Sequence, residues 1–210
     1  MTSQEKRKQE LNKKKIVLAI WSVFIVVAIV GVILFIKNYG KLKKASDNKE
    51  SKIYELNKNS DINFLIKRYL GALTGCDQET LKNLVTDPSQ FDNMTIYISR
   101  SNNVTGYSNI DCYTVDGMTD DSKLVFVVGN VSLKDVESKP KDIMVFYVVN
   151  VDGKYLINNE VDTKIQNHIE KMTVQKDIQE IYKMVKEDED KCYEEDETLR
   201  KFYERINGTN

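Results

Sequence analysis

The chain has 210 residues, 30% of them charged, and its 31 Lys and Arg nearly balance its 32 Asp and Glu. The balance hides a division, because residues 1–52 carry twelve basic and four acidic residues whereas the rest of the chain has a net charge of −9. Since phosphate backbones are bound by basic surfaces, the acidic C-terminal part argues against nucleic-acid binding. One histidine and three widely spaced cysteines supply no zinc-ligand pattern.

Residues 1–15 form a basic stub, and an uncharged apolar segment follows from residue 16 to residue 36. As a helix, 21 residues span about 30 Å, the thickness of a bilayer's hydrocarbon core. The segment is too long for a signal peptide and lacks a small-residue cleavage site after it. Because a short stub stays in the cytoplasm while long domains translocate, we expect a single-pass plasma-membrane anchor in contact with lipid, with an extracytoplasmic C-terminal domain.

Residues 37–59 are polar and lysine-rich and are predicted to be a juxtamembrane linker. A compact domain over residues 60–160 follows, and it begins with helices. Ser60 or Asp61 is the expected N-cap of the first helix, because apolar residues recur three and four positions apart from Ile62 to Leu73.

The periodicity changes to that of strands after residue 106. Four strands are expected at about 107–116, 123–133, 142–151 and 154–159. Asp152-Gly153 is a two-residue hairpin signal between the last two strands. The third strand is apolar on both faces, so it is predicted to be central, with helices on one face and a pocket or a partner on the other.

The C-terminal tail, residues 161–210, is predicted to be helical and acidic. Apolar residues recur at helical spacing from Ile165 to Val185, and eight acidic residues from Glu187 to Glu197 predict a solvated break before a last helix. The tail is a candidate surface for an envelope protein partner or for self-association. The side chains expected to contact that partner are Ile165, Ile169, Ile178 and Phe202.

Helices followed by a four-stranded meander, as carried by residues 64–77 (FLIKRYLGALTGCD) and 146–157 (FYVVNVDGKYLI), resemble the nuclear-transport-factor-2-like, or cystatin-like, superfamily. In that family the last hairpin often reads DGKW-x-I, and Tyr155 here replaces the tryptophan. The resemblance implies an α+β fold with helices packed on a curved antiparallel four-stranded sheet, between the transmembrane helix and the helical tail.

Enzymes of this superfamily place an Asp base, or an Asp/His pair, with Tyr donors in a cone-shaped pocket. The pocket candidates in this chain are Tyr69, Tyr97, Asp111, Tyr113, Asp116 and Tyr147. His168 lies in the tail, where a surface position is expected rather than a role as general base. No phosphate loop, nucleophile elbow or metal motif is present, so neither a catalytic residue nor a cofactor or metal is expected.

The composition, rich in Lys, Asn and Ile and poor in Pro, is typical of AT-rich bacteria. The sequence therefore favours a non-catalytic, membrane-anchored binding or scaffold module of a bacterial cell envelope. Three alternatives stay open: an inner-membrane scaffold component of conjugation or type IV secretion, a small-ligand enzyme with a carboxylate base, and a regulatory subunit whose basic stub contacts a cytoplasmic partner. A disulfide between Cys76 and Cys112 is a further alternative to their being free.

Overall fold

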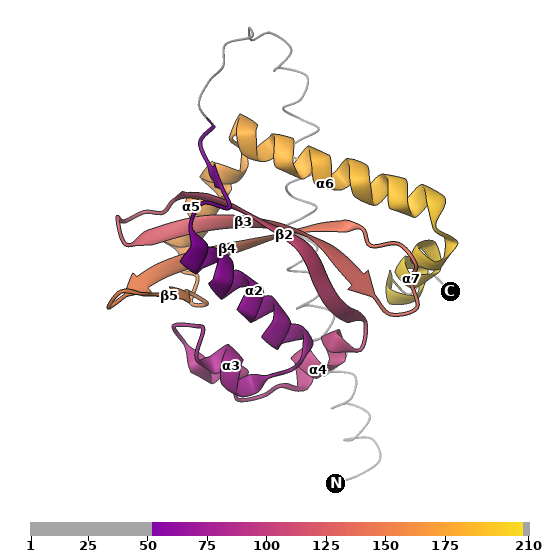
Figure 1. The fold of residues 1–210 in the computed structure, drawn as a ribbon, viewed down its shortest axis with the longest axis horizontal. Helices are drawn as coiled ribbons and strands as arrows, with labels where there is room; N and C mark the ends of the chain where they lie inside the picture. Colours follow the sequence, from indigo (N-terminus) through magenta and orange to yellow (C-terminus); the bar gives the residue numbers. More distant parts are fainter. Residues whose placement is uncertain (1–51, 208–210) are drawn as a thin grey trace, which may run out of the picture. The chain divides into compact units, whose positions relative to one another are not determined.

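A computed structural model describes residues 52–207 of the chain. The predicted stub (1–15), the predicted transmembrane helix (16–36) and residues 37–51 of the predicted linker lie outside the described residues. The described part is an α+β unit with six α-helices and a five-stranded antiparallel sheet (Figure 1). Among these residues no helix combines the length and the apolar character needed to cross a membrane.

The elements follow one another in the order expected from the sequence, with one strand added in front. They are β1 (Glu55–Leu56), α2 (Ser60–Thr74), α3 (Gln78–Lys82), a 3-10 turn (Pro88–Phe91), α4 (Thr95–Ser101), β2 (Val104–Asp116), β3 (Ser122–Leu133), β4 (Lys141–Val151), β5 (Lys154–Ile157), α5 (Thr163–Thr173), α6 (Lys176–Glu195) and α7 (Glu197–Asn207).

The strands are hydrogen-bonded in chain order, β1-β2-β3-β4-β5, and every neighbouring pair is antiparallel. The expectation of four strands is therefore wrong by one, because β1 comes from the segment predicted as linker. Its neighbour Asn57 holds it in place: the Asn57 side chain accepts a hydrogen bond from the Cys112 amide at 2.8 Å and donates one to the Asp111 carboxylate at 2.7 Å.

The first face of the sheet is covered by α2, α3 and α4 (Figure 1). Helix α2 begins after Asn59, one residue before the expected cap, because the Asn59 side chain accepts hydrogen bonds from the amides of Asp61 and Ile62. Its apolar stripe packs on strand residues such as Val125 and Val127. The buried members of this core are Ile62, Leu65, Ile66, Leu70, Ala72, Leu73, Leu81, Leu84, Val85, Phe91, Cys112, Val125, Val127, Val148 and Ile157.

The second face is covered by α5 and α6, which lie on the opposite side of the sheet from α2 (Figure 1). Ile178 and Ile181 of α6 are buried against Phe126 and Val128 of β3. The helical tail therefore shares a core with the sheet. This explains why β4 is apolar on both faces: one helical layer lies on each side, rather than a helix on one side and a pocket or a partner on the other.

The acidic stretch after Glu187 is helical nearly to its end, contrary to the expected solvated break. Helix α6 runs to Glu195, and the Lys186–Asp190 pair at 2.8 Å is one of its supporting interactions. Only Asp196 separates α6 from α7, and its carboxylate accepts hydrogen bonds from the amides of Ser138 and Thr198. Asp196 thus ties the turn between the two helices to the loop between β3 and β4.

Candidate functional site

The aromatic pocket candidates are divided between the two faces of the sheet. Tyr69 and Tyr97 pack in the core beneath α2, whereas Tyr113 and Tyr147 are buried in the core beneath α6. The Tyr147 hydroxyl donates to the Ser122 hydroxyl at 2.8 Å and accepts from the Met118 amide at 2.9 Å, which fixes the hairpin between β2 and β3. The sheet thus separates these four phenols instead of gathering them in one cavity.

The two carboxylate candidates lie at the margins of the sheet. Asp111 is bonded to Asn57, and Asp116 is exposed and forms an ion pair with Lys123 at 2.6 Å. His168 is half-buried, with its Nε2 3.3 Å from the Asp116 carbonyl oxygen and its ring 6.5 Å from that of Tyr147. The predicted carboxylate and phenol pocket is therefore not assembled, because its members face different sides of the sheet.

Aromatic rings fill the space between α2, α4 and the sheet, where the family resemblance implies a cone-shaped pocket. The Tyr69 ring lies 5.6 Å from that of Phe146 and 6.4 Å from that of Phe91, and Phe91 lies 4.9 Å from Tyr97, measured between centroids. Burial raises the pKa of Tyr69 to about 12. These aromatic side chains serve as core packing.

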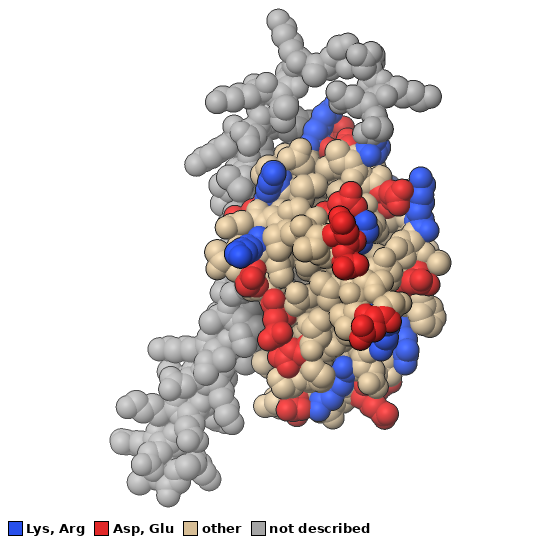
Figure 2. All heavy atoms as spheres, turned by 90° about the vertical axis from the view of Figure 1, so that its left-hand side faces the viewer, with Lys and Arg blue, Asp and Glu red and all other residues tan. Residues whose placement is uncertain are grey.

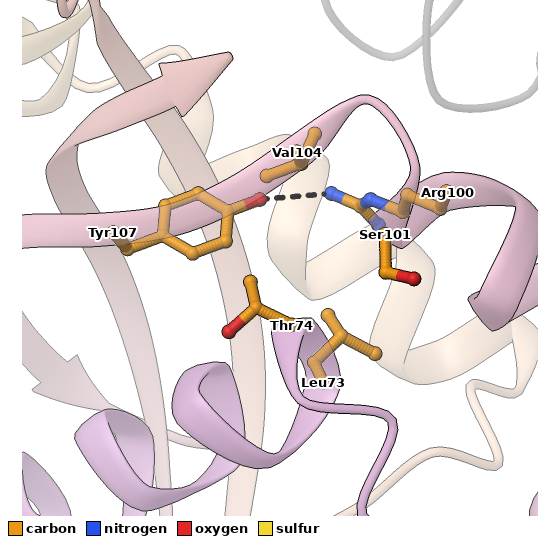
Figure 3. A pocket seen from close by; sticks show the side chains of 6 residues that line it. All are labelled: Leu73, Thr74, Arg100, Ser101, Val104 and Tyr107. Atoms are coloured by element: carbon orange, nitrogen blue, oxygen red, sulfur yellow. Dashed lines mark hydrogen bonds between the residues drawn. The ribbon is translucent and has the colours of Figure 1, made fainter. Parts of the chain in front are cut away.

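A shallow hollow lies at the rim of this core, between the end of α2, α4 and the start of β2 (Figure 3). It encloses no space for a water-sized molecule, whereas ligand pockets measure roughly 300–1,000 Å³. At one side of the hollow the Arg100 guanidinium donates a hydrogen bond of 3.1 Å to the Tyr107 hydroxyl. The other lining residues are Leu73, Thr74, Ser101 and Val104.

Asp142 is a polar residue of this region that was not among the predicted pocket residues. It is half-buried near the start of β4, on the same face of the strand as Met144 and Phe146. Burial raises its pKa, against the opposing effects of Arg100 and the neighbouring Ile143 amide, while Glu189 of α6 raises it further. The sequence offered one signal for this residue, because Asp142 alternates with Met144 and Phe146 along one face of an otherwise apolar strand.

The tail residues predicted to contact a partner pack instead within the chain. Ile178 is fully buried, Ile165 and Phe202 are 6% exposed, and Ile169 is half-buried against the α6-side core. These side chains are therefore engaged in the fold and are not free for a partner. The physical reason is that the second apolar face of the sheet needs a cover, and the tail supplies it.

The three cysteines are free, so Cys76 and Cys112 form no disulfide. Burial raises the pKa of the Cys112 thiol to about 11, which makes it unreactive at neutral pH. Within residues 52–207 no group of His, Cys, Asp and Glu has the arrangement of a metal site.

One edge of the sheet is incomplete, because β5 pairs only with Val148–Val151 of β4. Along residues 141–146, β4 has β3 on one side and no strand of the described chain on the other. We call this side of residues 141–146 the open edge. All six residues are half-buried.

The charged side chains on the face shown in Figure 2 are mixed in sign, with acidic and basic residues interspersed among neutral ones. This face carries no continuous basic surface of the kind that binds a phosphate backbone.

Comparison of the chain with protein-family models, with curated proteins and with solved structures gives no match.

Proposed function

We propose that the chain is a non-catalytic binding or scaffold module of a bacterial cell envelope, anchored by residues 16–36 in the plasma membrane with its folded unit outside the cytoplasm. The observation that carries the binding function is the open edge of β4. An exposed strand edge offers backbone donors and acceptors to a second chain, and several peptide-binding domains use one in this way. Anchor and orientation are proposed from the sequence.

The order of elements supports a nuclear-transport-factor-2-like fold as part of this proposal. Helices α2 to α4 precede a meander of long strands, and the β4–β5 hairpin turns at Asp152 and Gly153, with φ of 51° and 84°. These positive φ values are those of the two-residue turn that the sequence predicted. The additional strand β1 and the two tail helices on the second face go beyond the pattern quoted for the family.

The contacts made by the first described residues support the proposal that the folded unit lies close to a membrane anchor. Lys52 forms ion pairs with Asp177 at 3.1 Å and Glu180 at 2.7 Å, and the Ile53 amide donates to the Asp177 carboxylate at 2.9 Å. The described chain is thus held by α6 from its first residues. In the sequence, only residues 37–51 separate Lys52 from the proposed membrane segment.

Cysteine labelling in intact cells tests the anchor and its orientation. Cys76 and Cys192 are replaced by Ser, and a single reporter is introduced as Asp120→Cys in the exposed β2–β3 turn or as Ser3→Cys in the stub. We expect a membrane-impermeant maleimide to label the first variant in intact cells and the second only after lysis. Labelling of Ser3→Cys in intact cells, or protection of Asp120→Cys, would contradict the proposed orientation.

Photocrosslinking in cells tests the binding function. A photoreactive residue at Met144, on the open edge, is compared with one at Phe64, which is 67% exposed on α2. We expect one specific envelope protein to be captured from position 144 and not from position 64. The same adducts from both positions, or none from position 144, would count against a binding module that uses this edge.

A further inference from the structure

The residues of β4 that face the open edge can be assigned from three contacts. The Lys141 amide donates to the Asp188 carboxylate at 2.8 Å, the Tyr147 carbonyl accepts from the Asn158 amide at 2.8 Å, and Val151 pairs with Lys154 of β5 across a two-residue turn. Odd-numbered residues of β4 therefore point their backbone groups away from β3.

Two positions remain between these capped ends. The outward C=O groups of Ile143 and Val145 accept no hydrogen bond from another strand or helix of the described chain, and their N–H groups donate none to one. The Ile143 amide interacts locally with the carboxylate of its neighbour Asp142. The gap begins at the Asp188 contact to Lys141 and ends at the Asn158 contact to Tyr147. It fits a short extended segment that pairs with both positions, because a paired residue in an antiparallel ladder exchanges both of its backbone groups with its partner.

The side chains beside the gap are apolar on both faces of the strand. Ile143 and Val145 border the core beneath α6, and Met144 and Phe146 border the core beneath α2. Since cross-strand neighbours lie about 4.5–5.5 Å apart, an added strand would place its own side chains against these residues. Apolar or β-branched residues suit both faces.

The negative charge of Asp142 helps to decide which chain could pair with the open edge. Asp142 forms no ion pair within the described chain. Arg100, whose guanidinium is bonded to the Tyr107 hydroxyl, lowers the pKa of Asp142, and the acid Glu189 of α6 raises it. An added strand with Lys or Arg opposite Asp142 would give this carboxylate an ion-pair partner. Its ammonium or guanidinium would lie in a half-buried position, where ion pairs are screened less than on an open surface.

A second copy of the chain does not supply that cation. In an antiparallel pairing of two open edges, outward residues pair with outward residues, so even-numbered residues meet even-numbered ones. Asp142 would then face Pro140, Asp142, Met144 or Phe146 of the other copy, none of them positively charged. Charge complementarity therefore favours a different chain.

We propose that the open edge of β4 binds an extended segment of a partner protein as an added antiparallel strand, with a Lys or Arg of that segment opposite Asp142. The inference deepens the proposed binding function and rests on it, but its test uses purified protein and is independent of cellular orientation.

Two labelled peptides, TVTVTKT and TVTVTET, test the pairing on the full-length chain in nanodiscs. They differ only at the residue that would lie opposite Asp142. We expect the Lys peptide to bind at least about tenfold more tightly than the Glu peptide, a difference that corresponds to about 1.4 kcal/mol. In Asp142→Asn the preference should nearly vanish, and in Asp142→Lys it should reverse.

Position is tested separately with Val145→Pro, which removes an outward N–H and no bond to β3. This variant should weaken binding of the Lys peptide about tenfold while keeping the folded spectrum of the parent. Equal binding of the two peptides, an Asp142→Asn variant with an unchanged preference, or no binding would each overturn the proposal.

Two outcomes would replace the partner segment by another occupant. A dimer of the full-length chain that Val145→Pro dissociates would assign the edge to a second copy. Peptide binding that requires deletion of residues 37–49 would assign it to this chain's own basic segment. Failure of the peptide test with specific crosslinking retained would leave the binding module in place and remove only this mode of binding.

Discussion

The two edges of the sheet, along β2 and along β4, differ in the regularity of their strand pairing. Along β2, beyond the short strand β1, the pairing with β3 is interrupted by register shifts between Val104 and Gly106 and between Ser108 and Asp111. Asn109 in the second irregularity has a φ of 50°. Along β4, the pairing with β3 runs without a shift from Asn130–Lys141 to Ser122–Val149.

This difference shows which edge is available for another strand. Bulges twist an edge away from flat pairing and are among the devices by which proteins prevent unwanted strand addition. The β2 edge carries such devices, and β1 covers part of it. The β4 edge is regular, apolar in its side chains and closed only at its ends, by Asp188 and Asn158. A regular edge, in a sheet whose other edge carries bulges, supports the proposal that β4 binds a strand.

The largest expected effect on stability comes from weakening the packing of α6, the helix that supports both edges of the sheet. Helix α6 holds Lys52 and Ile53 before β1 and caps Lys141 of β4. Ile178→Ala in its fully buried stripe should lower the free energy of unfolding by about 2–5 kcal/mol, because it leaves a cavity under the sheet. Chemical denaturation measures this.

The matched control is Met184→Ala on the same helix, at a side chain that is 37% exposed. It should change the unfolding free energy by less than about 0.5 kcal/mol. Similar effects of the two substitutions would mean that α6 does not stabilise the sheet.

Proline at adjacent residues of β4 distinguishes its two sides. Met144 pairs with Val127 and points its N–H toward β3, whereas the N–H of Val145 points outward. Met144→Pro should therefore be less stable than Val145→Pro by about 1–3 kcal/mol, the cost of an unsatisfied ladder acceptor. Thermal unfolding of both variants measures the difference. If Val145→Pro were the less stable of the two, the assignment of odd-numbered β4 residues to the outward side would be wrong.

The bulge in β2 can be tested at Asn109. Its φ of 50° lies in the left-handed region, which is costly for a β-branched side chain. Asn109→Val should be about 1–2 kcal/mol less stable than Asn109→Gly, although both lose the hydrogen bond to Asn130. Urea unfolding of the pair provides the comparison, and equal stabilities would show that the bulge does not depend on this conformation.

The smallest effect is a pH dependence at the cap of the β4 edge. Burial raises the pKa of Asp188, but hydrogen bonds from the Lys141 side chain and amide outweigh it and hold the pKa below its usual value. The stabilisation is therefore present above the ordinary Asp pKa of about 3.9 and is lost as the pH falls through the lower folded pKa.

Asp188→Asn isolates that contribution. The difference in unfolding free energy between the parent and the variant should be at most about 1 kcal/mol at pH 7 and should shrink in acid below pH ~3.9. A difference that stays constant between these conditions would show that the Asp188 charge does not contribute.

Much of the fold follows from periodicity and turn chemistry. The strands β2 to β5 and the turn at Asp152-Gly153 were predicted because alternation and a two-residue turn are local signals. Strand β1 was missed because two paired residues leave no periodic signal, and its place depends on the long-range bonds of Asn57. The apolar second face of β4 was predicted, but what covers it was not.

The candidate site was less accessible to sequence reasoning. Tyr69 and Tyr113 were grouped as the phenol donors that the family resemblance implies, yet the sheet separates them. The open edge depends on where β5 stops, at its pairing with Val148, and on which backbone groups the Asp188 and Asn158 contacts occupy. Such facts come from pairing between strands, which no single stretch of sequence contains.

Residue-resolved amide hydrogen exchange along β4 tests the central claim most directly. In the full-length chain without peptide, the amides of Ile143 and Val145 should exchange much faster than those of Met144 and Phe146, which are bonded to β3. Adding the peptide TVTVTKT should slow exchange at Ile143 and Val145 selectively. Equal protection of all four amides without peptide, or no change at Ile143 and Val145 with it, would contradict an open edge that binds a strand.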